Sequence, residues 1–207
     1  RGLVGHSVRN TFGAIRPRDT GGDYKLELER LSNAFSLSSN MMLLMGKKFK
    51  TSEMLSGRFA DIFSNIYLCY SMLWFYEKHC PKNNQTEKLM EYCMDELMYE
   101  TQENFYDIIK NYPGFWGSRY IGMVSFPYGR RYRKASDDLK KEISDMVTNP
   151  GSVFDLFKEN VFIPNENEQL GKMIKTMELI SKNDINDIDT IAELREQISQ
   201  VNSFVKL

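Results

Sequence analysis

The sequence predicts an all-α protein, a helical bundle of about six to eight helices with a long central apolar helix. Turn-forming residues are scarce, since the 207 residues include only 13 Gly and 6 Pro. Apolar side chains recur at steps of three and four along most of the chain, and 12 Met add strong helix formers. No stretch alternates apolar and polar residues over the length of a strand.

The composition places the chain among ordinary globular proteins. It is 42% hydrophobic and 27% charged, and its 28 acidic side chains nearly balance 27 basic ones. No global field therefore attracts it to nucleic acid or an anionic bilayer. The three cysteines, Cys69, Cys80 and Cys93, are odd in number and form no CxxC pair. We expect buried or idle thiols in a reducing, intracellular compartment.

The chain is expected to consist of two parts. Residues 1–22 hold five glycines and Pro17 and are predicted to form a linker, whereas residues 23–207 are predicted to form one helical domain. Nothing near the start resembles a signal peptide. Residue 1 is Arg rather than Met, and the sequence leaves open whether the gene product is longer.

The first helix is predicted over residues 24–45. Asp23 is suited to its N-cap, and Gly46 stands where a left-handed residue is wanted at its C-terminal end. Its stripe of core positions consists of Tyr24, Leu28, Leu31, Phe35, Ser38, Met42 and Met45.

The second helix is predicted to start at Thr51 or Ser52 and to reach His79. No charged residue lies between Ile62 and Tyr76, and apolar side chains occupy nearly every face of this run. The run covers 15 positions, fewer than the roughly 20 needed to cross a bilayer. We therefore expect the wholly surrounded central helix of a bundle rather than a transmembrane span.

The third helix is predicted over residues 86–111, with an apolar stripe of Met90, Met94, Leu97, Thr101, Phe105 and Ile108. Its other side is acidic and carries Glu87, Glu91, Asp95, Glu96, Glu100 and Glu103. Carboxylates at such spacing can bind metal or transfer protons, but a ferritin-like site also needs Glu-x-x-His pairs. The only histidines are His6 and His79. We therefore expect a solvated acidic face and no metal.

The remaining helices are shorter. Residues 115–126 are predicted to form a buried aromatic helix or a pair of turns, followed by a helix over 136–148 and a short one after Ser152. Two more are predicted over 166–181 and 189–205. The last has a clean apolar stripe that suits docking on the body of the protein or on another subunit.

Familiar catalytic motifs are missing from the sequence: it has no phosphate-binding Gly-rich loop, no GxSxG, no HExxH and no Cys/His cluster. The unusual charge feature is the segment from Phe126 to Lys134, where Arg130, Arg131, Tyr132, Arg133 and Lys134 follow one another. Arg can bind phosphate or carboxylate and Tyr can stack on a base, so one interpretation is a site for nucleotide, coenzyme A, lipid head group or RNA.

The other interpretation is that these arginines pair with the acidic third helix and join two elements of the fold. A single short patch without a basic face is a weak indication of nucleic-acid binding. The sequence leaves both interpretations open, as anion contacts or as internal or interface contacts.

Three ordered segments carry a family resemblance: residues 29–39 (ERLSNAFSLSS), 54–68 (MLSGRFADIFSNIYL) and 126–137 (FPYGRRYRKASD). In order and spacing they resemble the C-terminal region of the long bacterial-type acyl-CoA dehydrogenases of fatty-acid degradation. The middle of the chain is also similar to the C-terminal extension of the very-long-chain enzymes. This chain has Arg131 where the family usually has an aromatic residue or His, and Ala135 where it commonly has Pro.

The resemblance implies an FAD-dependent oxidoreductase of fatty-acid β-oxidation whose catalytic core precedes this region. That core would supply the FAD loops and the glutamate base, and residues 1–22 would be its remnant or a linker. FAD is then expected for the full-length enzyme, with no catalytic, cofactor-binding or metal residue in this chain. The chain would serve assembly into a homo-oligomer, placement on a peripheral membrane surface, or completion of the acyl-CoA site.

Two alternatives remain open at the level of sequence. A free-standing helical adaptor would use the acidic third helix and the terminal helix to bind a partner protein. An RNA- or nucleotide-binding module would use residues 126–134 and is the least favoured. For the dehydrogenase, we expect a cytoplasmic or inner-membrane peripheral location in a bacterium and a mitochondrial one in a eukaryote.

Overall fold

The structure is a computed structural model that describes residues 24–149, 151–158, 162, 165, 168, 170–175, 195 and 199. The chain divides into two compact units, Arg1–His79 with Met90–Ser136, and Cys80–Leu89 with Asp137–Leu207. The described residues form helices and connecting segments without a strand, so the predicted all-α class is confirmed. The predicted linker over 1–22 and helix over 189–205 lie outside the described residues, apart from 195 and 199. Of the helix predicted over 166–181, residues 170–175 are described, and they are helical.

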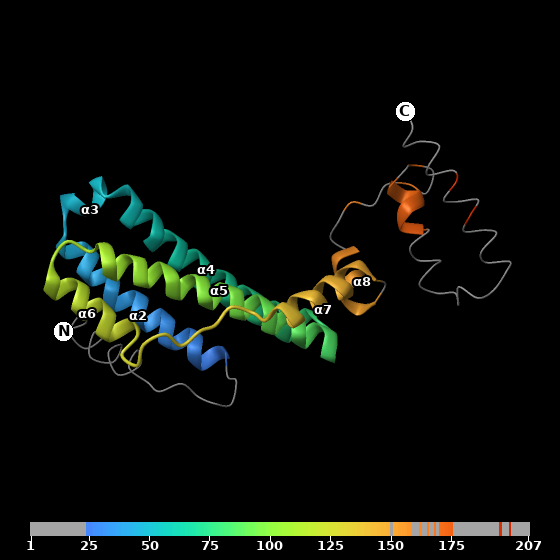
Figure 1. The fold of residues 1–207 in the computed structure, drawn as a ribbon, viewed down its shortest axis with the longest axis horizontal. Coiled ribbons are helices and arrows are strands. Elements are labelled where there is room, and N and C mark those ends of the chain that lie inside the picture. The colour runs from blue at the N-terminus through green and yellow to red at the C-terminus, as the bar shows by residue number, and fades with distance from the viewer. Residues whose placement is uncertain are drawn as a thin grey trace. The chain divides into compact units, whose positions relative to one another are not determined.

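The first unit is a bundle of α2, α4, α6 and most of α5 (Figure 1). Helix α2 spans Tyr24–Leu44 and buries Leu28, Leu31, Leu37 and Met42, as its periodicity predicts. It ends before Gly46, whose φ of 56° is the left-handed value expected there. Helix α3, Lys47–Thr51, is a short element that the sequence did not predict, and it packs on α4.

Helix α4 spans Glu53–His79, close to its predicted bounds. One face is buried through Leu55, Phe59, Ile62, Ile66 and Cys69. The rings of Phe59 and Phe35 of α2 stack with their centroids 4.5 Å apart, which joins the two helices. The opposite face is exposed, so the expectation of a helix surrounded on all sides is wrong for the described part of the chain. The physical reason is that α2, α3 and α5 cover only one side.

Helix α5 spans Asn84–Asn111 and begins two residues earlier than predicted. Asn83 caps it, because its side-chain oxygen accepts a hydrogen bond of 2.9 Å from the backbone N–H of Thr86. Its buried apolar positions follow the predicted stripe closely and consist of Met90, Met94, Met98, Phe105 and Ile108. Of the described helices, none is long and apolar enough to cross a membrane.

Helix α6, Phe115–Ser125, is the predicted short aromatic helix and packs along α2. The expectation that it is buried is wrong for its aromatic start, because Phe115 and Trp116 are exposed and only Ile121, Val124 and Ser125 are buried. Gly117 lets the start of α6 lie close to the Tyr112 ring, since a methyl group built on Gly117 would lie 2.1 Å from Cε1 of Tyr112. The Tyr112 hydroxyl donates to the Met41 carbonyl at 3.0 Å and ties the start of α6 to the end of α2. The chain then runs without helix from 126 to 136.

The second unit contains α7, Asp137–Thr148, and α8, Ser152–Lys158, which pack on each other. Both match predicted helices. Val153 is fully buried and Ile143 nearly so. Lys88 at the start of α5 forms an ion pair with Glu142 of α7 inside this unit.

Candidate functional site

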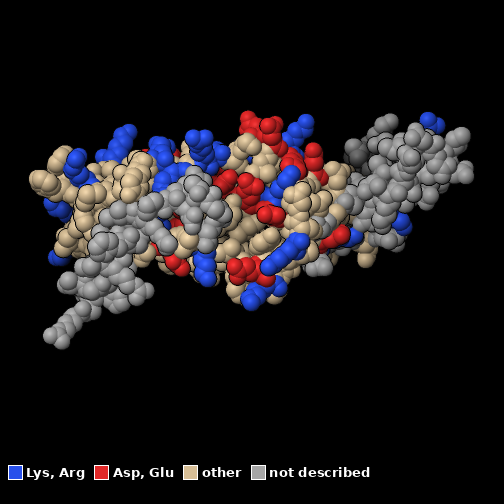
Figure 2. Space-filling view, turned by 90° about the horizontal axis from the view of Figure 1, so that it is seen from below, with Lys and Arg blue, Asp and Glu red and all other residues tan. Residues whose placement is uncertain are grey.

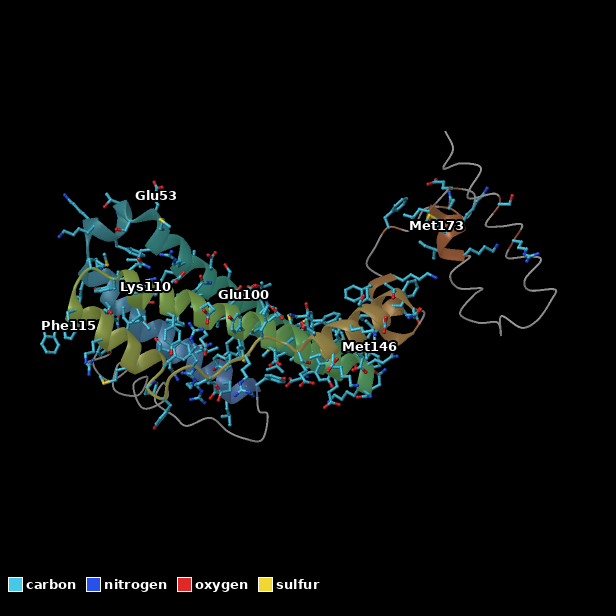
Figure 3. The ribbon with its side chains drawn as sticks, viewed as in Figure 1. Glu53, Glu100, Lys110, Phe115, Met146 and Met173 are labelled. Atoms are coloured by element: carbon cyan, nitrogen blue, oxygen red, sulfur yellow. The ribbon has the colours of Figure 1, made fainter. Side chains whose placement is uncertain are left out.

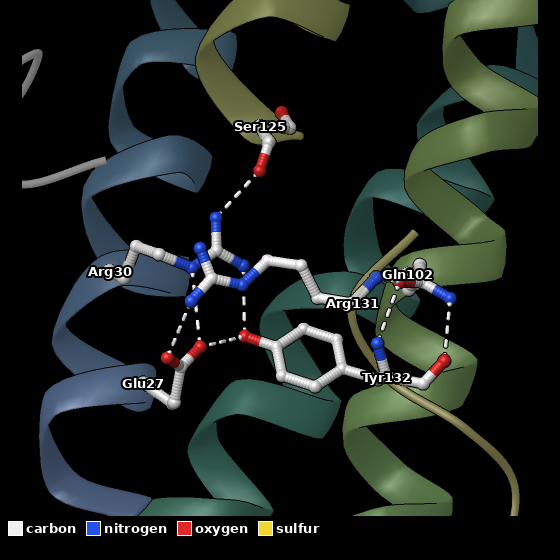
Figure 4. A network of polar contacts seen from close by, with 6 residues as sticks. All are labelled: Glu27, Arg30, Gln102, Ser125, Arg131 and Tyr132. Atoms are coloured by element: carbon white, nitrogen blue, oxygen red, sulfur yellow. Dashed lines mark hydrogen bonds and ion pairs between the residues drawn. The ribbon is translucent and has the colours of Figure 1, made fainter. Parts of the chain in front are cut away.

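A buried network of polar side chains joins α2 to the segment that follows α6 (Figure 4). Glu27 of α2 lies at its centre. Its Oε1 accepts a hydrogen bond of 2.7 Å from Nη2 of Arg131, and its Oε2 accepts one of 2.6 Å from the Tyr132 hydroxyl. Because charge-assisted bonds in a buried site are among the stronger polar interactions, Glu27 fixes both residues to α2.

Arg30, one turn further along α2, completes the network from the same helix. Its Nη1 donates to the Ser125 carbonyl at 2.6 Å, and its Nη2 donates to the Tyr132 hydroxyl at 2.8 Å. Its guanidinium carbon lies 5.4 Å from the ring centroid of Phe126, a cation–π distance. Arg30 is 2% exposed and thus satisfied from within the protein.

Gln102 of α5 holds the backbone of the same segment. Its Oε1 accepts the N–H groups of Arg131 at 2.7 Å and of Tyr132 at 3.0 Å. Its Nε2 donates to the Tyr132 carbonyl at 3.1 Å. A buried amide that pairs with three backbone groups replaces the hydrogen bonds this non-helical stretch lacks. The segment is therefore fixed to two helices at once.

The predicted site residues divide into two groups. Arg131 and Tyr132 are buried, and burial raises the pKa of the Tyr132 phenol above its ordinary value. Arg130 forms an ion pair with Glu103 of α5 and lies 4.7 Å from the ring centroid of Tyr106. Arg133 and Lys134 are exposed.

The acidic partner of Arg131 was missed by the sequence reasoning, which looked to the third helix. Arg130 does pair with that helix through Glu103, but Arg131 pairs with Glu27 of α2. The available signal was positional, because Glu27 and Arg30 fall beside the apolar stripe of α2 rather than opposite it. Charged residues at core positions indicate a buried pair.

The two buried arginines do not fit the diphosphate of a flavin. Arg30 and Arg131 are 2% and 8% exposed, and both already donate to Glu27. An incoming diphosphate would have to displace that carboxylate and open the core. In the described part of the chain these residues hold the fold rather than a cofactor.

A second feature is the outer face of α4, which is apolar and exposed. Phe63, Tyr67 and Trp74 are 58%, 65% and 57% exposed, and Leu68 and Phe75 extend the same surface. We call these five residues the α4 outer face. A shallow hollow of about 700 Å³ lies along part of it, lined by Tyr67, Leu68, Tyr70, Ser71, Met72, Trp74 and Phe75. Contiguous exposed aromatics of this kind mark an interaction surface.

A third feature lies where α2 ends and α6 begins. Leu44 is 77% exposed and Trp116 81% exposed. Figure 3 shows Phe115 projecting away from the bundle at this end. The neighbouring helix α3 adds three exposed lysines, Lys47, Lys48 and Lys50.

The rest of the described surface carries charged side chains of both signs. Among the described residues no group of three or more His, Cys, Asp or Glu could hold a metal ion. On the face in Figure 2, coloured acidic and basic side chains are interspersed, without the continuous basic stripe that nucleic acid needs. Burial raises the pKa of Cys69 to about 12, so it stays an inert thiol near neutrality.

Comparison with known families agrees with the quoted segments. Residues 3–187 match the family described as acyl-CoA dehydrogenase, C-terminal, bacterial type. The chain belongs to this family. The predicted resemblance is thereby confirmed, and the described part of this acyl-CoA dehydrogenase C-terminal domain is helical throughout its regular structure. No solved structure matches the chain.

The three segments that carried the resemblance now have structural roles. Residues 29–39 lie on α2 and residues 126–137 form the segment anchored by Glu27, Arg30 and Gln102. Residues 54–68 lie on α4 and contribute most of its buried face and three of the five residues of its outer face.

Proposed function

We propose that this chain is the non-catalytic C-terminal domain of an FAD-dependent acyl-CoA dehydrogenase of fatty-acid β-oxidation, and that it serves assembly of that enzyme. Family membership supports the link to the dehydrogenase. The flavin and the base that removes the substrate proton belong to an upstream catalytic core of the same polypeptide. In that core FAD accepts the hydride from the substrate, and this chain contributes no residue to the FAD site.

The α4 outer face is the observation that carries the assembly function. Its aromatic side chains lie in water in this chain, although an exposed patch of that size is unfavourable for a soluble domain. Covering it with another part of the enzyme removes the apolar area from water, at about 25 cal/mol per Å². An adaptor for an unrelated protein would use the acidic side of α5 instead, so charge-dependent binding would favour that alternative.

Assembly is tested in the complete enzyme. Tyr67→Ser with Trp74→Ser removes two exposed rings without opening the core, so the domain should keep its melting temperature. The variant enzyme should lose native subunit assembly, as measured by light scattering after gel filtration. Tyr128→Ser, another exposed tyrosine of the same unit, is the matched control and should assemble normally. Normal assembly of the double variant would refute this function.

The non-catalytic part has its own test. The purified chain should be colourless and should not reduce an electron acceptor in the presence of acyl-CoA. Flavin retained at one equivalent per chain would contradict it.

A second function, placement on an anionic membrane surface, is favoured by the end of the bundle at Leu44, Phe115 and Trp116. Exposed Leu and aromatic side chains beside lysines suit insertion at the headgroup level, with each cation adding about 1 kcal/mol. Sedimentation with phosphatidylserine vesicles tests it. Trp116→Ser should reduce binding, and added salt should weaken it; no vesicle binding at low salt would exclude it.

A further inference from the structure

We propose that the α4 outer face pairs with the same face of a second copy of this chain, with the two helices antiparallel about a two-fold axis near Tyr67. This proposal rests on the assembly function above and names its occupant. The proposal follows from how the size and charge of the exposed side chains vary along α4.

The side chains on the outer side of α4 change in size from one end of the helix to the other. Residues 57, 60 and 64 are Gly, Ala and Ser, and all three are exposed. Residues 67, 74 and 75 are Tyr, Trp and Phe, also exposed. Steps of three and four place these positions on one side of the helix. Along this line of positions the N-terminal half of α4 carries small side chains and the C-terminal half carries bulky ones, while Phe63 lies beside the line.

Gly57 has no role that the fold of this chain explains. A Cβ built on it would meet nothing within 4 Å, and its φ is not positive. Glycine inside a helix costs about 1 kcal/mol relative to alanine. A use that does require glycine is the close approach of another molecule to the helix backbone.

Antiparallel pairing about Tyr67 fits the two halves together. Residues seven positions before and after Tyr67 then oppose each other, which seats Trp74 of one copy on Ala60 of the other. Phe75 opposes position 59 and so lies over the turn of the helix that contains Gly57. Each contact occurs twice, because a two-fold interface is self-complementary. A parallel arrangement would instead place Trp74 of one copy against Trp74 of the other. Gly57 and Ala60 would each face the same residue of the other copy across a gap.

The charges at the two ends support the same register. Glu53 begins α4 on this side and Lys78 ends it, and neither has an ion-pair partner among the described residues. Antiparallel pairing brings Lys78 of one copy to within one turn of Glu53 of the other, twice over. No charged residue lies from 62 to 76, and Asp61, which is exposed one turn after Gly57, would stay at the rim of the contact in water.

The rings are also partly held before pairing. The His79 ring lies 5.0 Å from the centroid of Trp74 and 5.4 Å from that of Phe75. Side chains ordered in the free protein lose less entropy on binding. Half-exposed side chains of this size bury about 100 Å² each, so the ten from two copies bury about 1,000 Å², the lower limit of a specific interface. We therefore expect a reversible, concentration-dependent dimer.

Cysteine cross-linking tests the register in the full 207-residue chain. In a Cys80→Ser, Cys93→Ser background, Ser64→Cys mixed with Ser71→Cys should form a disulfide dimer under an added oxidant. These two positions oppose each other to within one residue in the antiparallel pair. Ala60→Cys alone is the matched control, since its two copies would lie about 21 Å apart at 1.5 Å per residue. Cross-linking of the control, or its absence in the mixture, overturns the proposal.

Sedimentation equilibrium tests the chemistry of the pair. Trp74→Glu should raise the dimer dissociation constant at least about 100-fold. Lys78→Glu should raise it about 10-fold, and adding Glu53→Lys to the same chain should restore it. Rescue by the second reversal is specific to a copy of this chain as partner, and its failure counts against the proposal.

Failure of the dimer and failure of the assembly function are distinguishable. Suppose that the chain stays monomeric while Tyr67→Ser with Trp74→Ser still disrupts assembly of the complete enzyme. The pairing of two α4 outer faces would then be refuted, but the assembly function would remain, with the catalytic core as the partner that covers this face. A monomeric chain and an undisturbed enzyme would overturn both.

Discussion

The Glu27 network and the α4 outer face lie in the same unit and depart from the usual burial pattern in opposite directions. In the first, charged side chains are enclosed, with Arg30 2% exposed. In the second, large aromatics are in water, with Tyr67 65% exposed. The enclosed charges find their partners inside the chain, whereas the exposed rings keep much of their surface in water. Under the proposed function the first region acts on stability and the second on association, so variants of the two should change different quantities.

The largest contrast is expected between adjacent residues of α4. Ile66→Asp places a carboxylate in the core, where it must be desolvated or protonated, and should lower the free energy of unfolding by about 5 kcal/mol. Tyr67→Asp lies on the outer face and should change it by less than about 0.5 kcal/mol. Urea melts of the two variants measure the difference. Equal losses would mean that the outer face is buried within the chain.

The network itself is broken most directly at Glu27. Glu27→Ala leaves Arg30 and Arg131 buried without their counter-charge, which should lower the free energy of unfolding by about 3–5 kcal/mol. Glu29→Ala, two residues further along on the exposed side, should have little effect. The same urea melts serve here. A loss below about 1 kcal/mol at Glu27 would show that the arginines find other partners.

Tyr132 connects both charges of the network through its hydroxyl. Tyr132→Phe keeps the ring and removes the donor to Glu27 and the acceptor for Arg30, so it should cost about 1–3 kcal/mol. Tyr128→Phe removes an exposed hydroxyl and is the control. If both variants melt alike, the hydroxyl contributes nothing to the fold.

The pH dependence of stability has a direction fixed by the same group. The pKa of Tyr132 is raised by burial above the value of 10.0 that the unfolded chain takes. The unfolded state then loses its proton first as the pH rises, so stability is complete below about pH 10 and falls above it. Cys69, whose pKa burial raises from 9.0 to about 12, adds a loss between those values. Tyr132→Phe should flatten the fall above pH 10, and an unchanged slope would contradict the assignment.

The smallest effect is expected at the rim of the network. Arg130 pairs with Glu103 where both side chains are partly in water. Arg130→Ala should cost about 0.2–1 kcal/mol at low salt and less at high salt. Melts at two salt concentrations check it. A loss as large as that of Glu27→Ala would place Arg130 in the buried network.

The helices could be predicted from sequence because each has a local cause. Steps of three and four, together with Gly46 at the end of the first helix, predict the ends of α2, α4 and α5 to within two residues. Helix α3 was missed because a five-residue element has too few positions to show a period.

The network could be predicted only in part, since its partners are distant in sequence. Glu27 and Arg131 are 104 residues apart, and nothing local selects α2 over the more acidic α5 as the partner of Arg131. The outer face of α4 was mistaken for core because apolar composition shows that a surface must be covered, not which molecule covers it. Both features become visible only in the three-dimensional structure.

Fluorescence of Trp74 tests the central claim most directly. The chain has two tryptophans, so Trp116→Phe leaves Trp74 as the sole one. In a dilute sample its emission should have the long wavelength of an indole in water. The emission should shift to shorter wavelength as the chain is concentrated or the enzyme assembles. Short-wavelength emission at every concentration would mean that the chain covers Trp74 itself. Long-wavelength emission in the assembled enzyme would mean that the α4 outer face is not an association surface.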